Sequence, residues 1–253
     1  MATLTAQHIN QLKNIVGESF VFFDEENLNH YGHDETEKLQ YNPEVVVKPR
    51  TTAEIASIMT MCNEALIPVT PRGAGTGLSG GALPNLGGVL LSTERLNSIL
   101  NIDERNLQVI VEPGVITEVL QNAVKEKGLF YPPDPSSRGS CFIGGNIAEN
   151  SGGPKAVKYG VVKDYVLNLE VVLPTGKIIW TGANVLKNST GYNLTQLMVG
   201  SEGTLGIVTK IVLKLLPHPK YDLLMLVPFN NLEKAGEAVS AIFRAGFTPS
   251  ALE

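Results

Sequence analysis

The fold of this chain is indicated most directly by residues 71–88, which read PRGAGTGLSGGALPNLGG. They contain the spacing G-x-G-x-x-G, from Gly75 to Gly80. That spacing marks a Rossmann dinucleotide site only where a helix begins at the third glycine. Here Gly81, Pro84 and two further glycines follow, so no helix can start, and no Lys-Ser or Lys-Thr pair completes a Walker motif. The loop therefore belongs to neither of these nucleotide-binding folds.

The same loop can nevertheless hold a phosphate group. Consecutive small residues expose successive backbone N–H groups, which can form an anion-binding nest. The hydroxyl groups of Thr76 and Ser79 would add two donors. Arg72 stands at the start of the loop, where its guanidinium would either contact a phosphate or serve as a surface or structural charge. The sequence leaves both roles of Arg72 open.

The glycines are concentrated in three stretches. Of 25 glycines, seven fall in residues 73–88, six in residues 139–160 and three in residues 200–206. Glycine is favoured where the backbone needs a positive φ angle or must let another group approach closely. Three such loops, far apart in the sequence, favour convergence on one bound group. Tight turns in a strand-rich protein are the alternative.

Composition excludes several classes of protein. Hydrophobic residues make up 43% and charged residues 18% of the 253 positions, which is typical of a folded protein. The 20 basic and 25 acidic residues give a net charge of −5, which argues against nucleic acid or an anionic membrane as the main partner. The sequence shows neither a secretory signal nor an apolar run that could span a bilayer, so a cytoplasmic protein is expected.

Side chains that commonly bind metals are sparse. Cys62 and Cys141 are too few for a disulfide framework or a cysteine-rich metal site, and burial in the core is favoured for both. None of the four histidines has a carboxylate or cysteine partner at ligand spacing. No metal site is therefore predicted.

The predicted elements divide the chain into four parts: a helical lead-in (1–39), a small α/β subdomain (40–96), an α+β subdomain (97–219) and the beginning of a further domain (220–253). Apolar periodicity and turn residues predict helices at 5–16, from Thr51 onward, at 116–127 and at 231–245. They predict strands at 44–48, 67–70, 88–92, 98–103, 106–112, 165–173, 177–181, 206–215 and 221–228. One strand and one helix cannot form a domain, so we expect the last part to be incomplete.

Two of the predicted helices are expected to pack on a core through their apolar positions. The helix that begins after Thr51 would bury Ile55, Ile58, Met59, Cys62 and Leu66. The last helix would turn inward Ala235, Val239, Ile242 and Phe243.

Four further motifs follow the glycine loop: VEPGV (111–115), PPDPSS (132–137), SCFIGGNIAENSGGPKAVKYG (140–160) and VGSEGTLGIVTKI (199–211). With PRGAGTGLSGG they make roughly residues 40–220 resemble the FAD-binding domain of flavoproteins of the vanillyl-alcohol-oxidase or p-cresol-methylhydroxylase type. The resemblance is to the branch that contains the glycolate oxidase FAD subunit and D-lactate and D-2-hydroxyglutarate dehydrogenases. It implies an α+β fold: a two-subdomain FAD-binding domain followed by the start of a truncated α/β cap domain for the substrate.

The resemblance also implies where FAD binds. The backbone of residues 72–79 would wrap the pyrophosphate, residues 134–153 would line the isoalloxazine and ribityl portion, and residues 202–208 would close over the adenosine. The residues expected to bind the cofactor are Pro71, Arg72, Gly73, Ala74, Gly75, Thr76, Gly77, Leu78, Ser79, Pro113, Asp134, Pro135, Ser136, Ser140, Gly144, Gly145, Asn146, Ala148, Asn150, Ser151, Gly152, Gly153, Glu202, Gly203, Gly206, Ile207 and Val208. Some relatives bond the flavin to a histidine of the glycine loop, but this loop has none, so non-covalent FAD is expected.

The reaction implied by the resemblance is oxidation of a 2-hydroxy acid of the glycolate or D-lactate type. A base would remove the hydroxyl proton while hydride passes from the α-carbon to flavin N5. No residue of this chain is assigned as that base, and the sequence does not identify the electron acceptor. Two alternatives stay open: a flavoprotein of the same fold that acts on another alcohol or a sugar, and a non-catalytic flavin-binding subunit of an electron-transfer complex. A homodimer or a partner subunit is open as well.

Overall fold

The structure is a computed structural model and describes residues 3–253. Its first sheet has four strands in the order β1 (Val21–Phe22), β2 (Val45–Val47), β4 (Val89–Ser92) and β3 (Val69–Arg72). β2, β4 and β3 run parallel, and β1 pairs antiparallel with β2. Because β1 lies within residues 1–39, the lead-in contributes a strand to the sheet of the first subdomain.

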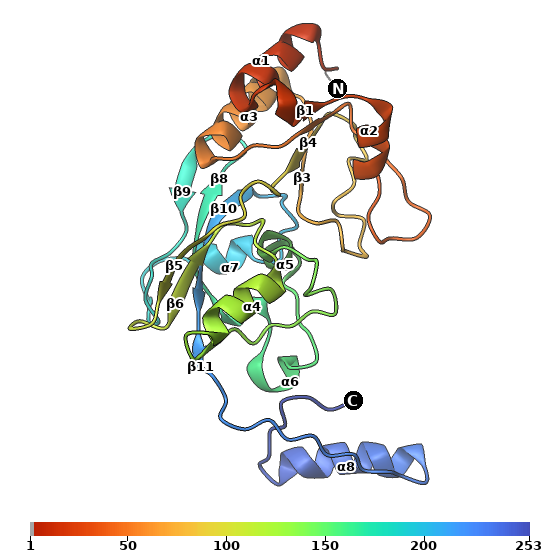
Figure 1. The fold of residues 1–253 in the computed structure, drawn as a ribbon, viewed down its shortest axis with the longest axis vertical. Coiled ribbons are helices and arrows are strands. Elements are labelled where there is room, and N and C mark those ends of the chain that lie inside the picture. Colours follow the sequence, from red (N-terminus) through yellow and green to blue (C-terminus); the bar gives the residue numbers. More distant parts are fainter. Residues whose placement is uncertain (1–2) are drawn as a thin grey trace.

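Helices cover both faces of this first sheet. α1 (Ala6–Val16) and α3 (Thr52–Ala65) pack on one face, and residues of α2 (Glu25–Tyr31) pack on the other. Figure 1 shows α1 and α3 side by side at one end of the molecule. Burial on both faces explains why β2 and the first three residues of β4 are continuous apolar runs rather than alternating strands.

Helix α3 begins where the sequence predicts. The Thr51 side chain accepts a hydrogen bond from the Glu54 backbone N–H, and Ile55, Ile58 and Cys62 are buried. Burial raises the pKa of the Cys62 thiol to about 12, which is consistent with a packing role. The prediction that Leu66 packs inward is wrong. Leu66 has a left-handed backbone conformation at the end of the helix, so its side chain leaves the buried face.

The second sheet has five antiparallel strands in the order β5 (Ile99–Asp103), β6 (Gln108–Val111), β10 (Ile207–Lys214), β8 (Val166–Val172) and β9 (Ile178–Trp180). Helices α4 (Thr117–Lys125) and α5 (Ile143–Glu149) pack on it and share its core. Val172 and Ile207 of this sheet pack into the core of the first subdomain. The two subdomains are therefore joined by buried apolar contacts.

The strands and helices predicted between residues 44 and 215 are all present, with ends shifted by a few residues. The elements that the sequence pattern does not predict are all short: β1, β7 (Leu129–Phe130), β11 (Leu216–Pro217), α2, α5, α6 (Ala156–Tyr159), α7 (Leu194–Met198) and the 3₁₀ helices Glu18–Phe20 and Val162–Asp164. Most of them are too short to show a clear periodicity. Among residues 3–253, no helix is both long and apolar enough to cross a membrane.

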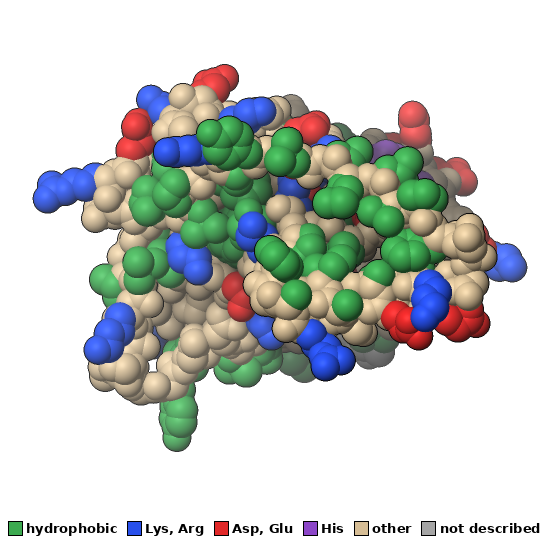
Figure 2. All heavy atoms as spheres, turned by 90° about the horizontal axis from the view of Figure 1, so that it is seen from below, with side chains coloured by type: hydrophobic (Ala, Val, Ile, Leu, Met, Phe, Trp, Pro, Cys, Tyr) green, Lys and Arg blue, Asp and Glu red, His purple; other side chains and the backbone are tan. Residues whose placement is uncertain are grey.

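The C-terminal part differs from the sequence prediction. Helix α8 (Leu232–Arg244) is confirmed, but the predicted strand at 221–228 is wrong, because the segment pairs with no strand among residues 3–253. Leu224 is 100% exposed, and α8 buries none of its residues, so its predicted inward face is wrong as well. Figure 2 shows hydrophobic side chains gathered on this end of the molecule.

Candidate functional site

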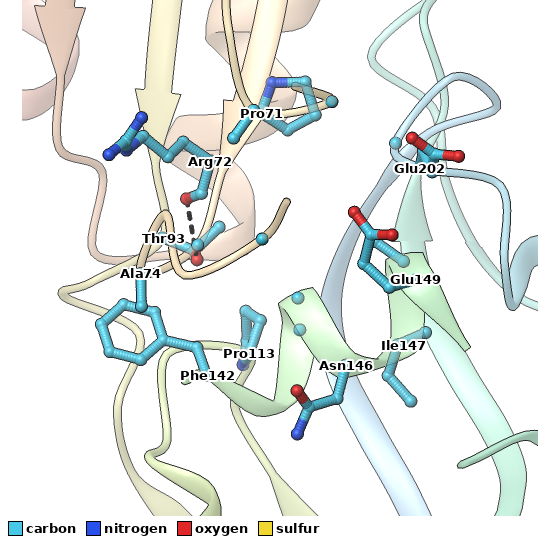
Figure 3. A pocket seen from close by; sticks show the side chains of 18 of the residues that line it. Pro71, Arg72, Ala74, Thr93, Pro113, Phe142, Asn146, Ile147, Glu149 and Glu202 are labelled. Atoms are coloured by element: carbon cyan, nitrogen blue, oxygen red, sulfur yellow. Dashed lines mark hydrogen bonds between the residues drawn. The ribbon is translucent and has the colours of Figure 1, made fainter. Parts of the chain in front are cut away.

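A cleft lies between the two subdomains, where segments distant in sequence come together. Its main walls are the loop that follows β3, the helix α5, and the loop that precedes β10 (Figure 3). The cleft contains about 1060 Å³ of empty space, part of which is open to solvent. The predicted convergence of the three glycine-rich stretches on one site is confirmed.

The structure brings most of the predicted cofactor residues together at this cleft. Those that line it are Pro71, Arg72, Gly73, Ala74, Gly75, Thr76, Gly77, Pro113, Gly144, Gly145, Asn146, Ala148, Ser151, Glu202, Gly203, Gly206, Ile207 and Val208. Those that do not line it are Leu78, Ser79, Asp134, Pro135, Ser136, Ser140, Asn150, Gly152 and Gly153.

Several residues of the second group support the cleft from behind its lining. The Asp134 carboxylate lies 3.1 Å from the Lys155 ammonium, and the Asp134 backbone occupies the place of a side chain at Gly153. The Asn150 side chain accepts a hydrogen bond of 3.0 Å from the Lys163 backbone. The Ser79 hydroxyl donates to Glu149 at 3.1 Å, so it links the glycine loop to α5.

The glycine loop presents its backbone rather than its side chains. Within residues 3–253, none of the N–H groups of residues 73–79 donates a hydrogen bond to another protein atom. Residues 73–77 line the cleft and none of residues 73–79 is buried, so these N–H groups are open to a bound acceptor or to water, and a run of small residues of this kind can form an anion-binding nest. A phosphate group supplies several such acceptors.

Arg72 lies behind this loop. Its side chain is only 7% exposed, and Nη1 donates to the Tyr31 backbone oxygen at 3.2 Å. Burial lowers the pKa of Arg72, partly offset by the charges of Asp34 and Glu94. The guanidinium also occupies the place that a side chain at Gly75 would need, and Gly75 has φ +74°. Of the two roles left open by the sequence, this arrangement favours a structural charge that supports the loop.

The opposite wall is the start of α5. Gly144 lies against Pro113, where a Cβ atom would come within 2.6 Å of the Pro113 side chain. A Cβ atom at Gly145 would meet no other atom within 4 Å, because this residue faces the open space of the cleft. The two glycines therefore leave a smooth, open surface at this wall. The concentration of glycines in residues 139–160 predicts a loop there, but Gly144 and Gly145 lie in the first turn of α5.

The structure also adds residues that the sequence analysis missed. The further lining residues are Asp34, Gly81, Ala82, Thr93, Ser137, Cys141, Phe142, Ile147, Glu149, Met198 and Ser201. Most adjoin predicted residues, so motif proximity could have found them. Asp34, Thr93 and Met198 belong to no glycine-rich motif, and only tertiary packing brings them to the cleft.

Two carboxylates give one end of the cleft an acidic character. Figure 3 shows Glu149 and Glu202 on the side away from Phe142. A Cβ atom at Gly81 would lie only 2.7 Å from the Glu202 carboxylate, so Glu202 packs closely over this glycine. Carboxylates accept hydrogen bonds from hydroxyl and amino groups, so this end suits a sugar or a base better than a phosphate. In the part of the chain that the structure describes, no three metal-binding side chains cluster.

Comparison with known proteins identifies the family. Residues 43–182 match the model of the FAD binding domain family, so the chain belongs to that family, and FAD is its cofactor. The glycolate oxidase subunit GlcD of Bacillus subtilis (strain 168) is 50% identical over 91% of this chain and 50% of its own length. D-lactate dehydrogenase of Anaerostipes hadrus is 43% identical over 99% of this chain and 52% of its own length. The chain thus spans about half the length of the curated relatives that it matches.

Solved structures confirm the fold. Alkyldihydroxyacetonephosphate synthase superposes with a TM-score of 0.85, at 22% identity, over 99% of this chain and 47% of that protein. The 4-ethylphenol oxidase of Gulosibacter chungangensis superposes with a TM-score of 0.73, at 27% identity, over 85% of this chain and 43% of that one. The α+β, two-subdomain FAD-binding fold of the p-cresol-methylhydroxylase type is therefore confirmed.

The residues at the cleft fit FAD. Its pyrophosphate needs several hydrogen-bond donors, and the N–H groups of residues 73–77 at the cleft are free to donate. Its flat ring needs a surface without projecting side chains, which Gly144 and Gly145 supply. Its adenosine carries hydroxyl and amino donors, which suit the carboxylates of Glu149 and Glu202.

Proposed function

We propose that the whole protein is a FAD-dependent oxidoreductase that oxidises a 2-hydroxy acid of the glycolate or D-lactate type. The observation that carries this proposal is the identity of 50% and 43% to a glycolate oxidase subunit and a D-lactate dehydrogenase, over more than nine-tenths of this chain. When bound, FAD supplies the acceptor for the hydride of the substrate α-carbon. Residues 1–253 bind and orient the cofactor, and we assign no catalytic base among them.

Each wall of the cleft has a separate task in this proposal. The N–H groups of residues 73–79 hold the pyrophosphate, with Arg72 supporting the loop from behind. Gly144, Gly145 and Pro113 bound the space for the isoalloxazine ring. Residues 202–208 face the adenosine. Asp134 and Gly153, with their neighbours, keep the wall beside the ring in place.

The mode of attachment and the assembly are also part of the proposal. FAD binds non-covalently, because the loop carries Thr76 and no histidine. The Bacillus relative is named as a subunit, which supports a partner subunit for this protein. The electron acceptor is not identified, a homodimer is the alternative assembly, and the cytoplasmic location stays a prediction.

Two glycine substitutions test the cofactor site. Gly75→Ala introduces a side chain at φ +74°, where the Arg72 guanidinium already lies, and it should distort the loop. The matched control is Gly128→Ala, which has φ +71° and open space around the new side chain. Fluorescence titration with FAD should show roughly tenfold or greater weakening for Gly75→Ala and no change for Gly128→Ala. Equal FAD affinity in both variants would contradict the assigned phosphate loop.

The substrate class is tested in a protein of the relatives' full length that contains this chain. It is loaded with FAD and mixed without oxygen with glycolate, D-lactate, a sugar and a simple alcohol. Loss of the visible flavin absorption with a 2-hydroxy acid, and not with the other compounds, is the expected result. Bleaching only by the sugar or the alcohol would overturn the substrate class while leaving FAD binding intact.

A further inference from the structure

Residues 32–42 form a loop, the clasp, that lies between α2 and β2. The two ends of the clasp are joined, because the Tyr41 N–H donates to the Gly32 backbone oxygen at 2.8 Å. The Asn42 side chain donates to that of Asn29 at 2.6 Å and closes the loop further. A compact loop whose ends meet is an Ω-loop, and such loops frequently carry function. The family model begins at residue 43 and leaves the clasp without a role.

The clasp meets the glycine loop at two points. Asp34 lines the cleft together with Arg72, and both side chains are buried. The Leu39 side chain lies over Gly80, where a Cβ atom would come within 3.3 Å of it. Figure 1 shows the segment after α2 beside the loop between β3 and β4. Burial lowers the pKa of Arg72, and the Asp34 charge opposes this more than any other group, so the two side chains attract each other.

The Asp34 carboxylate has one oxygen without a partner. Its Oδ1 accepts a hydrogen bond of 2.8 Å from the Thr36 N–H, which fixes the carboxylate within the clasp. Asp34 Oδ2 and Thr36 Oγ1 are sealed from solvent and have no hydrogen-bond partner among residues 3–253. A charged oxygen that is buried and unpaired is costly. The clasp therefore holds an acceptor that needs a donor.

The Arg72 guanidinium has donors without acceptors. A guanidinium carries five N–H groups, and the bond to the Tyr31 backbone oxygen is the only hydrogen bond that this one donates within residues 3–253. Asp34 Oδ2 is not among its partners in this structure. An unpaired acceptor and unpaired donors thus belong to two side chains that line the same cleft. A movement of the clasp that joins the two groups would satisfy both.

We propose that FAD binding closes the clasp: the Asp34 carboxylate then accepts hydrogen bonds from the Arg72 guanidinium, and this ion pair fixes the glycine loop. The inference rests on the proposed cofactor site. A cofactor in the cleft excludes water from both side chains, and opposite charges attract more strongly where water is excluded. Because Arg72 is the last residue of β3, holding it also holds the start of the glycine loop. Asp34 is thus a positioning residue that acts through Arg72.

The first test follows trypsin cleavage of the unmodified protein with and without FAD. Lys38 is exposed on the clasp, and cleavage after it reports local opening of this loop. FAD should slow cleavage after Lys38 by roughly tenfold, measured by mass spectrometry of the fragments. Cleavage after Lys187, which is exposed in the loop between β9 and α7, should keep its rate. Equal cleavage after Lys38 with and without bound FAD would overturn the proposal, whereas failure to bind FAD at all would instead contradict the proposed function.

The second test examines the positioning role of Asp34. Asp34→Asn removes the charge at nearly constant shape, so FAD should bind about tenfold more weakly and should no longer protect Lys38 from trypsin. Glu37→Gln is the matched control, because it removes the same charge from an exposed position of the clasp and should change neither property.

The dependence of Asp34 on Arg72 is tested by combining their substitutions. In an Arg72→Gln protein the ion pair is already lost, so adding Asp34→Asn should weaken FAD binding no further. Fluorescence titration of both single variants and the double variant measures this coupling. Wild-type or tighter FAD binding by Asp34→Asn, or a loss in the double variant equal to the two single losses combined, would show that Asp34 does not act through Arg72.

Discussion

Two segments of equal length, β10 and residues 221–228, show what an apolar run needs to become a strand. β10 reads IVTKIVLK and is paired on both sides, with β6 and with β8. Residues 221–228 read YDLLMLVP and have no neighbouring strand, and their leucines are almost fully exposed. The ladder of hydrogen bonds that defines a strand needs a neighbouring strand, so an apolar composition alone does not produce one.

Polar groups show a similar contrast between positions that have a protein partner and positions that lack one. The Glu170 carboxylate accepts hydrogen bonds from Thr52, Thr209 and Lys210, and it joins α3 to the second sheet. The Tyr131 hydroxyl is sealed in the core and has no hydrogen-bond partner in the described part of the chain. Among residues 3–253, the N–H groups of residues 73–77 also lack protein partners, but these residues line an open cleft. An unpaired group therefore indicates a ligand only where a ligand can reach it.

The largest effect on stability is expected from a substitution in β10, the strand that is paired on both sides. Ile211→Ala in β10 removes a fully buried side chain from the core of the second sheet and should lower the free energy of unfolding by about 3 to 4 kcal/mol. Leu224→Ala, in the unpaired segment, should change it by less than about 0.5 kcal/mol. Urea denaturation of both variants measures the difference. Similar losses would mean that residues 221–228 have partners in solution.

The next largest effect on stability is expected from substitution of Glu170. Glu170→Ala removes the shared acceptor of Thr52, Thr209 and Lys210 and should lower the free energy of unfolding by about 2 to 3 kcal/mol. Glu18→Ala is the control: Glu18 pairs with Lys13 at 2.9 Å on the surface, where solvent screens the pair, so little change is expected. Comparable losses in the two variants would contradict the role of Glu170 in joining the subdomains.

Glu170 also predicts a dependence of stability on pH. Burial raises the pKa of Glu170, but the hydrogen bonds from Thr52, Lys210 and Thr209 outweigh it, and the net pKa lies below its ordinary value. A lowered pKa in the folded state adds stability above the pKa of the unfolded chain, about 4.3 for Glu, and this stability is lost as the pH falls through the folded value. Urea denaturation from pH 6 down to acid should therefore show a smaller decline for Glu170→Gln than for the wild type. Parallel declines of stability in Glu170→Gln and the wild type would show that Glu170 does not contribute to the pH dependence.

The smallest effect is expected at Tyr131. Burial raises the pKa of Tyr131 above its ordinary value, with Cys141 and Tyr165 adding to the rise, so the hydroxyl stays protonated. Because this hydroxyl has no partner, Tyr131→Phe should leave the free energy of unfolding unchanged or raise it by up to about 1 kcal/mol. Thermal denaturation measures the change. A marked loss of stability would reveal a partner of the hydroxyl, such as a buried water.

Much of the fold could be predicted from local sequence. Helix α3 follows from the Thr51 cap and its apolar spacing, and the hairpin of β5 and β6 follows from its turn. The failures have physical causes: Leu66 lies past the end of its helix, and residues 221–228 lack a partner. Neither a helix terminus nor the absence of a neighbour can be seen in a periodicity.

The candidate site also has features that local sequence predicts and features that it does not. The glycine loop and the residues around 144–146 and 202–208 were found because glycine spacing and motif resemblance mark them. The position of Arg72 behind the loop, and the contact of Leu39 with Gly80, could not be predicted. They depend on how segments 41 residues apart pack together.

The central claim is that the unpaired N–H groups of residues 73–79 belong to a FAD site. Its most direct test is titration of the purified chain with FAD, followed by flavin fluorescence and by the visible absorption spectrum. The account predicts saturable binding of one FAD per chain, released on acid precipitation because the attachment is non-covalent, and weakened in Gly75→Ala but not in Gly128→Ala. Saturable binding that is equally strong in Gly75→Ala, or no binding of FAD at any concentration, would contradict it.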